Sequence, residues 1–92
     1  MVPDILHKNI HISGRVQGVG FRYNAREAAS HYGITGFIRN QPNGDVYIEV
    51  EGARPALDEF IGWCRQGPPR SRVVAVDVTE GEVQGFGEFK VR

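Results

Sequence analysis

The 92-residue sequence predicts an α+β fold, a two-layer sandwich in which two helices cover one face of an antiparallel sheet. Apolar and polar residues alternate in KNIHIS (8–13) and in DVYIEVE (45–51), which is the period of a half-buried strand. In residues 21–32 and 54–66 apolar residues recur with the period of an amphipathic helix. With the strands described below, the order is β-α-β-β-α-β plus a short C-terminal strand, the split-βαβ or ferredoxin-like arrangement.

The first strand places Ile10 and Ile12 on one face. The polar side chains on its other face are those of Asn9, His11 and Ser13. A glycine-rich loop follows, and the first helix begins near Phe21. The apolar stripe of this helix comprises Phe21, Ala25, Ala28, Ala29 and Tyr32. Gly33 follows that stripe directly and is a typical residue to end a helix.

A hairpin is predicted in the middle of the chain, with strands at residues 34–40 and 45–51. The two strands are joined by Gln41-Pro42-Asn43-Gly44, where proline presets φ and Asn-Gly tolerates left-handed backbone. The third strand has Val46, Ile48 and Val50 on its apolar face. We expect its other face to be solvated, and the residues there are Tyr47, Glu49 and Glu51.

The second helix is predicted at residues 54–66, with Pro55 in its first turn and Gly67-Pro68-Pro69 ending it. Its apolar stripe comprises Leu57, Phe60, Ile61 and Cys64. A fourth strand is expected at residues 72–78 and a short last strand at residues 86–91. The whole of residues 1–92 is expected to form a single domain.

Composition narrows the class of protein and its compartment. Eleven basic and eleven acidic residues balance, which argues against a general nucleic-acid binder but allows a local anion site. The single cysteine, Cys64, excludes an internal disulfide, and a reducing, cytoplasmic location is expected. We find no signal peptide and no run of about 20 apolar residues that would span a membrane. A monomer without membrane or nucleic-acid partners is expected.

The stretch GRVQGVGFR (14–22) is the most informative part of the chain, because it places glycines and arginines between a strand and a helix. Gly18 and Gly20 allow consecutive backbone N–H groups to form a concave anion site at the start of the helix. Arg22 lies in the first helical turn, where a cation opposes the helix dipole unless an anion is bound. Spacing alone does not decide between an anion site and an ordinary glycine-rich turn.

Known nucleotide-binding fingerprints do not fit this loop. A Walker loop requires Gly-Lys-Ser/Thr, but Gly20 is followed by Phe21 and Arg22. The dinucleotide pattern GxGxxG fails because Tyr23 stands at the third glycine position. An RNA-recognition motif needs several aromatic residues on the open sheet face, and the strand at 45–51 offers only Tyr47.

GRVQGVGFR, followed eighteen positions after Arg22 by Asn40 in GFIRNQPNGDV, resembles the acylphosphatase family. The resemblance extends over nearly the whole chain. It also includes the EG at Glu51-Gly52, the LxxFxxWC run at Leu57–Cys64, the GP at Gly67-Pro68 and the terminal FxVR. The family often has a larger residue at the position of Gly20, and glycine there is expected to loosen the loop.

The resemblance implies an enzyme that hydrolyses acyl phosphates to a carboxylate and inorganic phosphate, without metal, cofactor or covalent intermediate. It implies that Arg22 binds the phosphate and that Asn40 positions the attacking water. The loop residues whose backbone N–H groups would hold the phosphate are Arg15, Val16, Gln17, Gly18, Val19 and Gly20. Inorganic phosphate or sulfate would occupy the same site.

Several alternatives remain open at this point. The base is either the substrate's own phosphate or a carboxylate on the solvent side. The chain is either a free-standing hydrolase or a non-catalytic module that binds phosphate or carbamoyl phosphate, as at the front of a hydrogenase-maturation protein. The histidines, His7, His11 and His31, are interpreted as solvated surface groups rather than metal ligands. Cys64 is interpreted as buried and inert.

Overall fold

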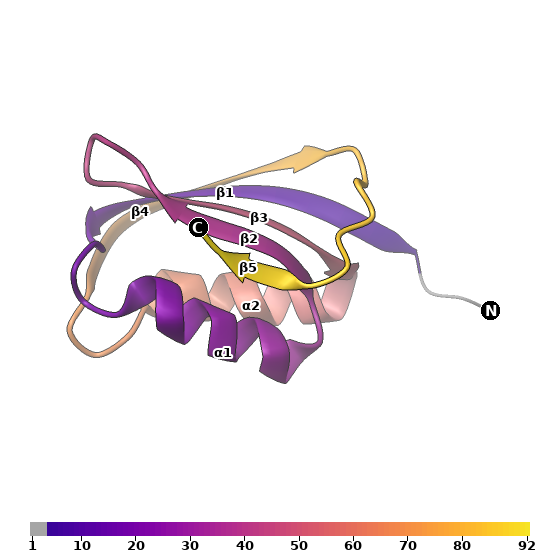
Figure 1. Ribbon diagram of the computed structural model, residues 1–92, viewed down its shortest axis with the longest axis horizontal. Coiled ribbons are helices and arrows are strands. Elements are labelled where there is room, and N and C mark those ends of the chain that lie inside the picture. The colour runs from indigo at the N-terminus through magenta and orange to yellow at the C-terminus, as the bar shows by residue number, and fades with distance from the viewer. Residues whose placement is uncertain (1–3) are drawn as a thin grey trace.

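Two helices lie against one face of a five-stranded sheet in the computed structural model, which describes residues 4–92 (Figure 1). The elements are β1 (Ile5–Arg15), α1 (Phe21–Tyr32), β2 (Thr35–Asn40), β3 (Val46–Ala53), α2 (Arg54–Gln66), β4 (Arg72–Gly81) and β5 (Phe89–Val91). The predicted α+β order is confirmed, and both helices begin and end as predicted. The first strand is longer than predicted and the last strand is shorter.

The strand order is β4-β1-β3-β2-β5, and the sheet is mixed, so the prediction of an antiparallel sheet is wrong for its last pair. The first four strands pair antiparallel, whereas β5 runs parallel to β2. After β4 the chain crosses to the opposite edge at the same end of the sheet and turns back (Figure 1). Because β4 and β2 point in opposite directions, a strand that reverses β4 must run along β2.

The core lies between the sheet and the helices. On β1 the buried Ile10 and Ile12 pair with Ile48 and Val46 of β3, so their apolar faces form one surface. Phe60 of α2 is completely buried against this surface. Each such side chain stabilises the fold by about 1.5–3 kcal/mol relative to an exposed one. Phe21, the first residue of α1, belongs to the same buried core, so this packing holds the start of α1 against the sheet.

The opposite face of the sheet is not uniformly solvated, contrary to the sequence prediction. His7 and Glu51 are only 4% and 3% exposed, although both lie on the face opposite the helices. The segment between β4 and β5 covers them, and the backbone N–H groups of Gln84, Gly85 and Phe86 donate to the Glu51 carboxylate. The interpretation of His7 as a surface histidine is therefore wrong.

Within residues 4–92, no helix has the length and the apolar character needed to cross a membrane.

Candidate active site

The loop from residue 16 to residue 20 connects the end of β1 to the start of α1. A register shift in the β1–β4 pairing between Ser13 and Gly14 bends β1 just before this loop. The side chains of Val16 and Val19 are 1% and 5% exposed and belong to the core. Because these two side chains point inward, the backbone between them is anchored at both ends and lies at the surface.

Positive φ angles at two glycines shape the loop. Gly18 has a φ of 72° and Gly20 a φ of 78°, both in the left-handed region that side chains disfavour. Within the described residues, the backbone N–H groups of residues 16–20 have no hydrogen-bond acceptor. Such unpaired N–H groups in a glycine turn form a typical anion-binding concavity.

The N-terminus of α1 adds to the positive potential at this loop. Gly20 precedes the helix, and the helix receives no side-chain cap there. The first turn contains no acidic residue, and it contains Arg22 instead. The free N–H groups and the dipole of the helix favour a negative charge at this end. The unpaired N–H groups of the loop, the N-terminus of α1 and the cation of Arg22 therefore all favour a bound anion at this place.

Gln17 ties the loop to the β2–β3 turn. Its Nε2 donates to the backbone oxygens of Gln41 at 2.7 Å and Asp45 at 2.8 Å. Gln41 follows Asn40 directly, so this contact fixes the loop relative to the end of β2. The sequence assigned only the backbone of Gln17 to the site, and the structure shows that its side chain also joins the loop to this turn.

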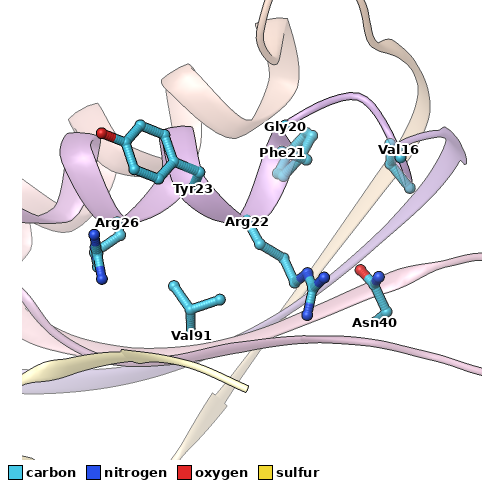
Figure 2. A pocket seen from close by; sticks show the side chains of 9 residues that line it. Val16, Gly20, Phe21, Arg22, Tyr23, Arg26, Asn40 and Val91 are labelled. Carbon is cyan, nitrogen blue, oxygen red and sulfur yellow. The ribbon is translucent and has the colours of Figure 1, made fainter.

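Arg22 and Asn40 meet across the pocket. The Arg22 guanidinium extends from α1 toward Asn40 at the end of β2 (Figure 2). Arg22 Nη1 donates to the backbone oxygen of Arg92 at 2.7 Å, which leaves other N–H donors of the guanidinium available. Asn40 Oδ1 is buried and accepts no hydrogen bond from any described residue. A buried amide oxygen without a protein partner is unusual, and such an atom is available to accept a hydrogen bond from a water or a ligand.

The pocket between these groups has a volume of about 290 Å³. Of the residues predicted to form the site, five line it: Val16, Gly18, Gly20, Arg22 and Asn40. Arg15, Gln17 and Val19 are not among its lining residues. Arg15 is the exposed last residue of β1, whereas Gln17 and Val19 hold the loop from its other side.

Four further residues line the pocket and were missed by sequence reasoning: Phe21, Tyr23, Arg26 and Val91. Arg26 lies one helical turn after Arg22, a spacing that the sequence already contains. Val91 lies on β5, which reaches α1 only because the chain crosses the sheet, and no local pattern signals that.

The remaining chemically interesting side chains lie outside this pocket. Within residues 4–92, no group of three or more His, Cys, Asp or Glu side chains is arranged to hold a metal ion. His11 is paired with Asp45 at 2.6 Å, and His31 is exposed on α1. Cys64 is buried, as expected, and this burial raises the pKa of its thiol well above the usual range.

The fold and the pocket define a class of small α+β sandwich proteins whose first strand-to-helix loop forms an amide- and arginine-lined site. The family model for acylphosphatase matches residues 8–91, and the chain belongs to the acylphosphatase family. An acylphosphatase of Acaryochloris marina is 43% identical over 91 residues, which cover 99% of this chain and 98% of the relative.

Solved structures agree with this family assignment. The crystal structure of acylphosphatase from Bacillus subtilis superposes with a TM-score of 0.92 at 36% identity, covering 95% of this chain and 98% of that chain. Full-length HypF in its phosphate- and nucleotide-bound form matches with a TM-score of 0.89 at 35% identity. That match covers 100% of this chain but 12% of HypF, so the same fold also occurs within a much longer protein.

Proposed function

We propose that the protein hydrolyses the carboxyl–phosphate bond of small acyl phosphates and releases a carboxylate and inorganic phosphate. Membership of the acylphosphatase family supports this activity. The observation that supports the site is the unpartnered, buried Oδ1 of Asn40 in the pocket that the Arg22 guanidinium enters. Such a pair offers one group for an anion and one for a water molecule.

In this proposal the phosphate is bound by the loop and by Arg22. The unpaired N–H groups of residues 16–20 donate to its oxygens, and the guanidinium neutralises the charge that they share. Phosphoryl transfer needs charge neutralisation and alignment more than covalent chemistry, and these groups supply both. Inorganic phosphate or sulfate binds in the same place because it presents the same oxygens.

Asn40 positions the attacking water in this mechanism. Its Oδ1 accepts one hydrogen bond from the water, whose lone pair then faces phosphorus. The water oxygen bonds to phosphorus as the bond from phosphorus to the carboxylate oxygen breaks, and the electron pair leaves with the carboxylate. None of the described residues that line the pocket has a carboxylate, which favours a phosphate oxygen of the substrate as the acceptor of the water's proton.

The domain organisation, oligomeric state and location of the protein are also part of the proposal. We infer one domain over residues 1–92, since the described elements form one sheet with one core. It acts as a monomer in the cytoplasm on a small molecule, without metal, cofactor, nucleic-acid or membrane partner. The balanced charge supports the absence of a nucleic-acid partner, and the free, buried thiol of Cys64 supports a reducing location.

A second candidate is a binding module for phosphate or carbamoyl phosphate that does not turn over its ligand. The similarity to a small part of HypF supports this candidate, because the same fold is there one part of a much longer protein. A binding module needs the loop and Arg22, but it has no use for a water held by Asn40. Turnover therefore separates the two candidates.

The test measures hydrolysis of benzoyl phosphate by the wild type, without added metal and again with EDTA. We expect equal release of benzoate and phosphate in both conditions. Arg22→Ala should lower kcat/KM by about 10²–10³-fold, the loss typical of one transition-state donor. Arg65→Ala, at an exposed arginine near the end of α2, serves as the matched control and should retain full activity. Phosphate binding without any turnover would support the module instead.

A further inference from the structure

Arg26 lies in the same pocket as Arg22 but has no part in the proposed mechanism. It stands four residues further along α1, so both guanidinium groups arise from one face of the helix. Figure 2 shows Arg26 on the side of Val91 away from Asn40, at the opposite end of the pocket from the catalytic pair. The pocket therefore has two cationic ends.

The Arg26 guanidinium is held at this end by an aromatic ring. Its central carbon lies 5.6 Å from the centre of the Tyr23 ring, within the range of a cation–π contact. Tyr23 is 59% exposed and also lines the pocket. Within residues 4–92, no Asp or Glu side chain pairs with Arg22 or Arg26, and Arg22 donates to the main-chain oxygen of Arg92. A stacked guanidinium without an ion pair retains its N–H donors for a ligand.

Two like charges four residues apart destabilise a helix, and the cation of Arg22 in the first turn also opposes the helix dipole. A phosphate bound at Arg22 neutralises the charge of Arg22 but leaves the charge of Arg26 without a counter-charge. The pocket volume of about 290 Å³ approaches the roughly 300 Å³ at which small-ligand pockets begin, so an acyl group fits beside the phosphate. Val91 provides an apolar surface between the two ends for carbon atoms of that group.

We propose that Arg26 is a specificity-determining residue, which binds a second anionic group on the acyl part of the substrate. The preferred substrates are then monoacyl phosphates of short dicarboxylic acids or of other acids that carry a second negative charge. This inference rests on the proposed hydrolysis of acyl phosphates and adds the class of acyl group that the pocket selects.

The test compares two acyl phosphates of equal chain length, succinyl phosphate and butanoyl phosphate. The measured quantity is the ratio of their kcat/KM values, determined at low and at high ionic strength. In the wild type we expect this ratio to exceed one and to fall as salt screens the second charge. Arg26→Gln should lower the ratio about fivefold, the upper end of what an exposed ion pair contributes.

Two further variants sharpen this test. Arg26→Lys keeps the charge and should retain most of the ratio, whereas Arg65→Gln removes an arginine from α2 and should leave the ratio unchanged. If Arg26→Gln and Arg65→Gln give the same ratio as the wild type, the specificity role of Arg26 is wrong although acyl phosphates are still hydrolysed. If the wild type hydrolyses neither substrate, the proposed function fails and this inference fails with it.

Discussion

His7 Nδ1 lies 2.6 Å from Glu51 Oε2, and both side chains are buried on the face of the sheet opposite the helices. The other ring nitrogen of His7 faces two oxygens, Asn9 Oδ1 at 2.9 Å and Glu49 Oε1 at 3.1 Å. An imidazole with an oxygen acceptor at each nitrogen is stabilised in its doubly protonated, cationic form. The pair therefore forms a buried ionic contact that joins β1, β3 and the segment before β5.

The pKa values of this pair make stability depend on pH. Burial lowers the pKa of His7, but the hydrogen bonds to Glu51 and Asn9 and the charges of Glu49 and Glu51 outweigh it and raise that pKa above 6.5. The cation then contributes stability that is complete below pH 6.5 and is lost as the pH rises through the raised pKa. We expect the urea midpoint of the wild type to exceed that of His7→Gln by more at pH 6 than at pH 9.

Each unit by which the pKa of His7 is raised corresponds to about 1.4 kcal/mol of stability. His31→Gln, at an exposed histidine of α1, is the control and should show no such trend with pH. A difference between wild type and His7→Gln that stays constant from pH 6 to pH 9 would show that His7 is neutral in the folded protein.

Glu51 has the opposite pH dependence. Burial raises the pKa of its carboxyl, but hydrogen bonds from the backbone of Gln84, the side chain of His7 and the backbone of Phe86 and Gly85 outweigh it and lower that pKa. Its contribution to stability is complete above pH 4.5 and is lost as the pH falls through the lowered pKa. Glu51→Gln should cost roughly 3 kcal/mol at neutral pH, because it leaves His7 without its buried partner.

Hydrogen exchange locates this effect. In Glu51→Gln the amides of residues 84–86 should exchange faster than those of the β1–β3 ladder, since the carboxylate is their acceptor. Glu80→Gln removes an exposed carboxylate that pairs with Lys8, and it is expected to leave these amides protected. Unchanged protection of residues 84–86 in Glu51→Gln would contradict the anchoring role of Glu51.

Gly18 and Gly33 provide a matched pair for testing the loop. Their φ angles are 72° and 69°, and a Cβ at either position meets no atom within 4 Å. Alanine should therefore strain both backbones equally, at about 1 kcal/mol each. Only Gly18→Ala should weaken inhibition by inorganic phosphate, by about tenfold or more. Gly18 lies in the loop and lines the pocket, whereas Gly33 ends α1 and does not line the pocket. Equal inhibition constants for the two variants would show that the loop does not bind phosphate.

The side chain of Gln17 is expected to act through position rather than contact. Gln17→Ala removes the two hydrogen bonds to Gln41 and Asp45, each worth about 1 kcal/mol, and frees the loop from the β2–β3 turn. We expect KM for benzoyl phosphate to rise more than kcat falls, since the phosphate must then order the loop on binding. Gln66→Ala, at the exposed end of α2, is the control. A drop in kcat alone would argue against this role.

Local patterns in the sequence predict most of this fold but not the path of the chain after β4. The alternation around Ile10 and Ile48 predicts strands, and the stripe from Phe21 predicts α1, because burial on one face determines each period. The burial of Glu51 depends on backbone N–H groups of residues 84–86, which no side-chain pattern encodes. The parallel pairing of β5 depends likewise on the path of a seven-residue connection across the sheet.

Part of the candidate site can likewise be predicted from local sequence, and part of it depends on the tertiary fold. Gly18, Gly20 and Arg22 lie within five residues of sequence, so their anion-binding chemistry is visible locally. Asn40 alone is an ordinary residue before a turn, and only the family motif singles it out. The structure then places it in the same pocket as Arg22, together with Arg26 and Val91. That grouping requires the tertiary fold.

The most direct test is the effect of Asn40→Ala on kcat and on inhibition by inorganic phosphate, with Gln66→Ala at the exposed end of α2 as control. We predict a loss of about 10²–10³-fold in kcat for Asn40→Ala with little change in the phosphate inhibition constant, because the variant loses the water and keeps the loop and Arg22. Gln66→Ala should retain both values. If Asn40→Ala keeps the wild-type kcat, or loses kcat and phosphate binding together, Asn40 does not position the attacking water.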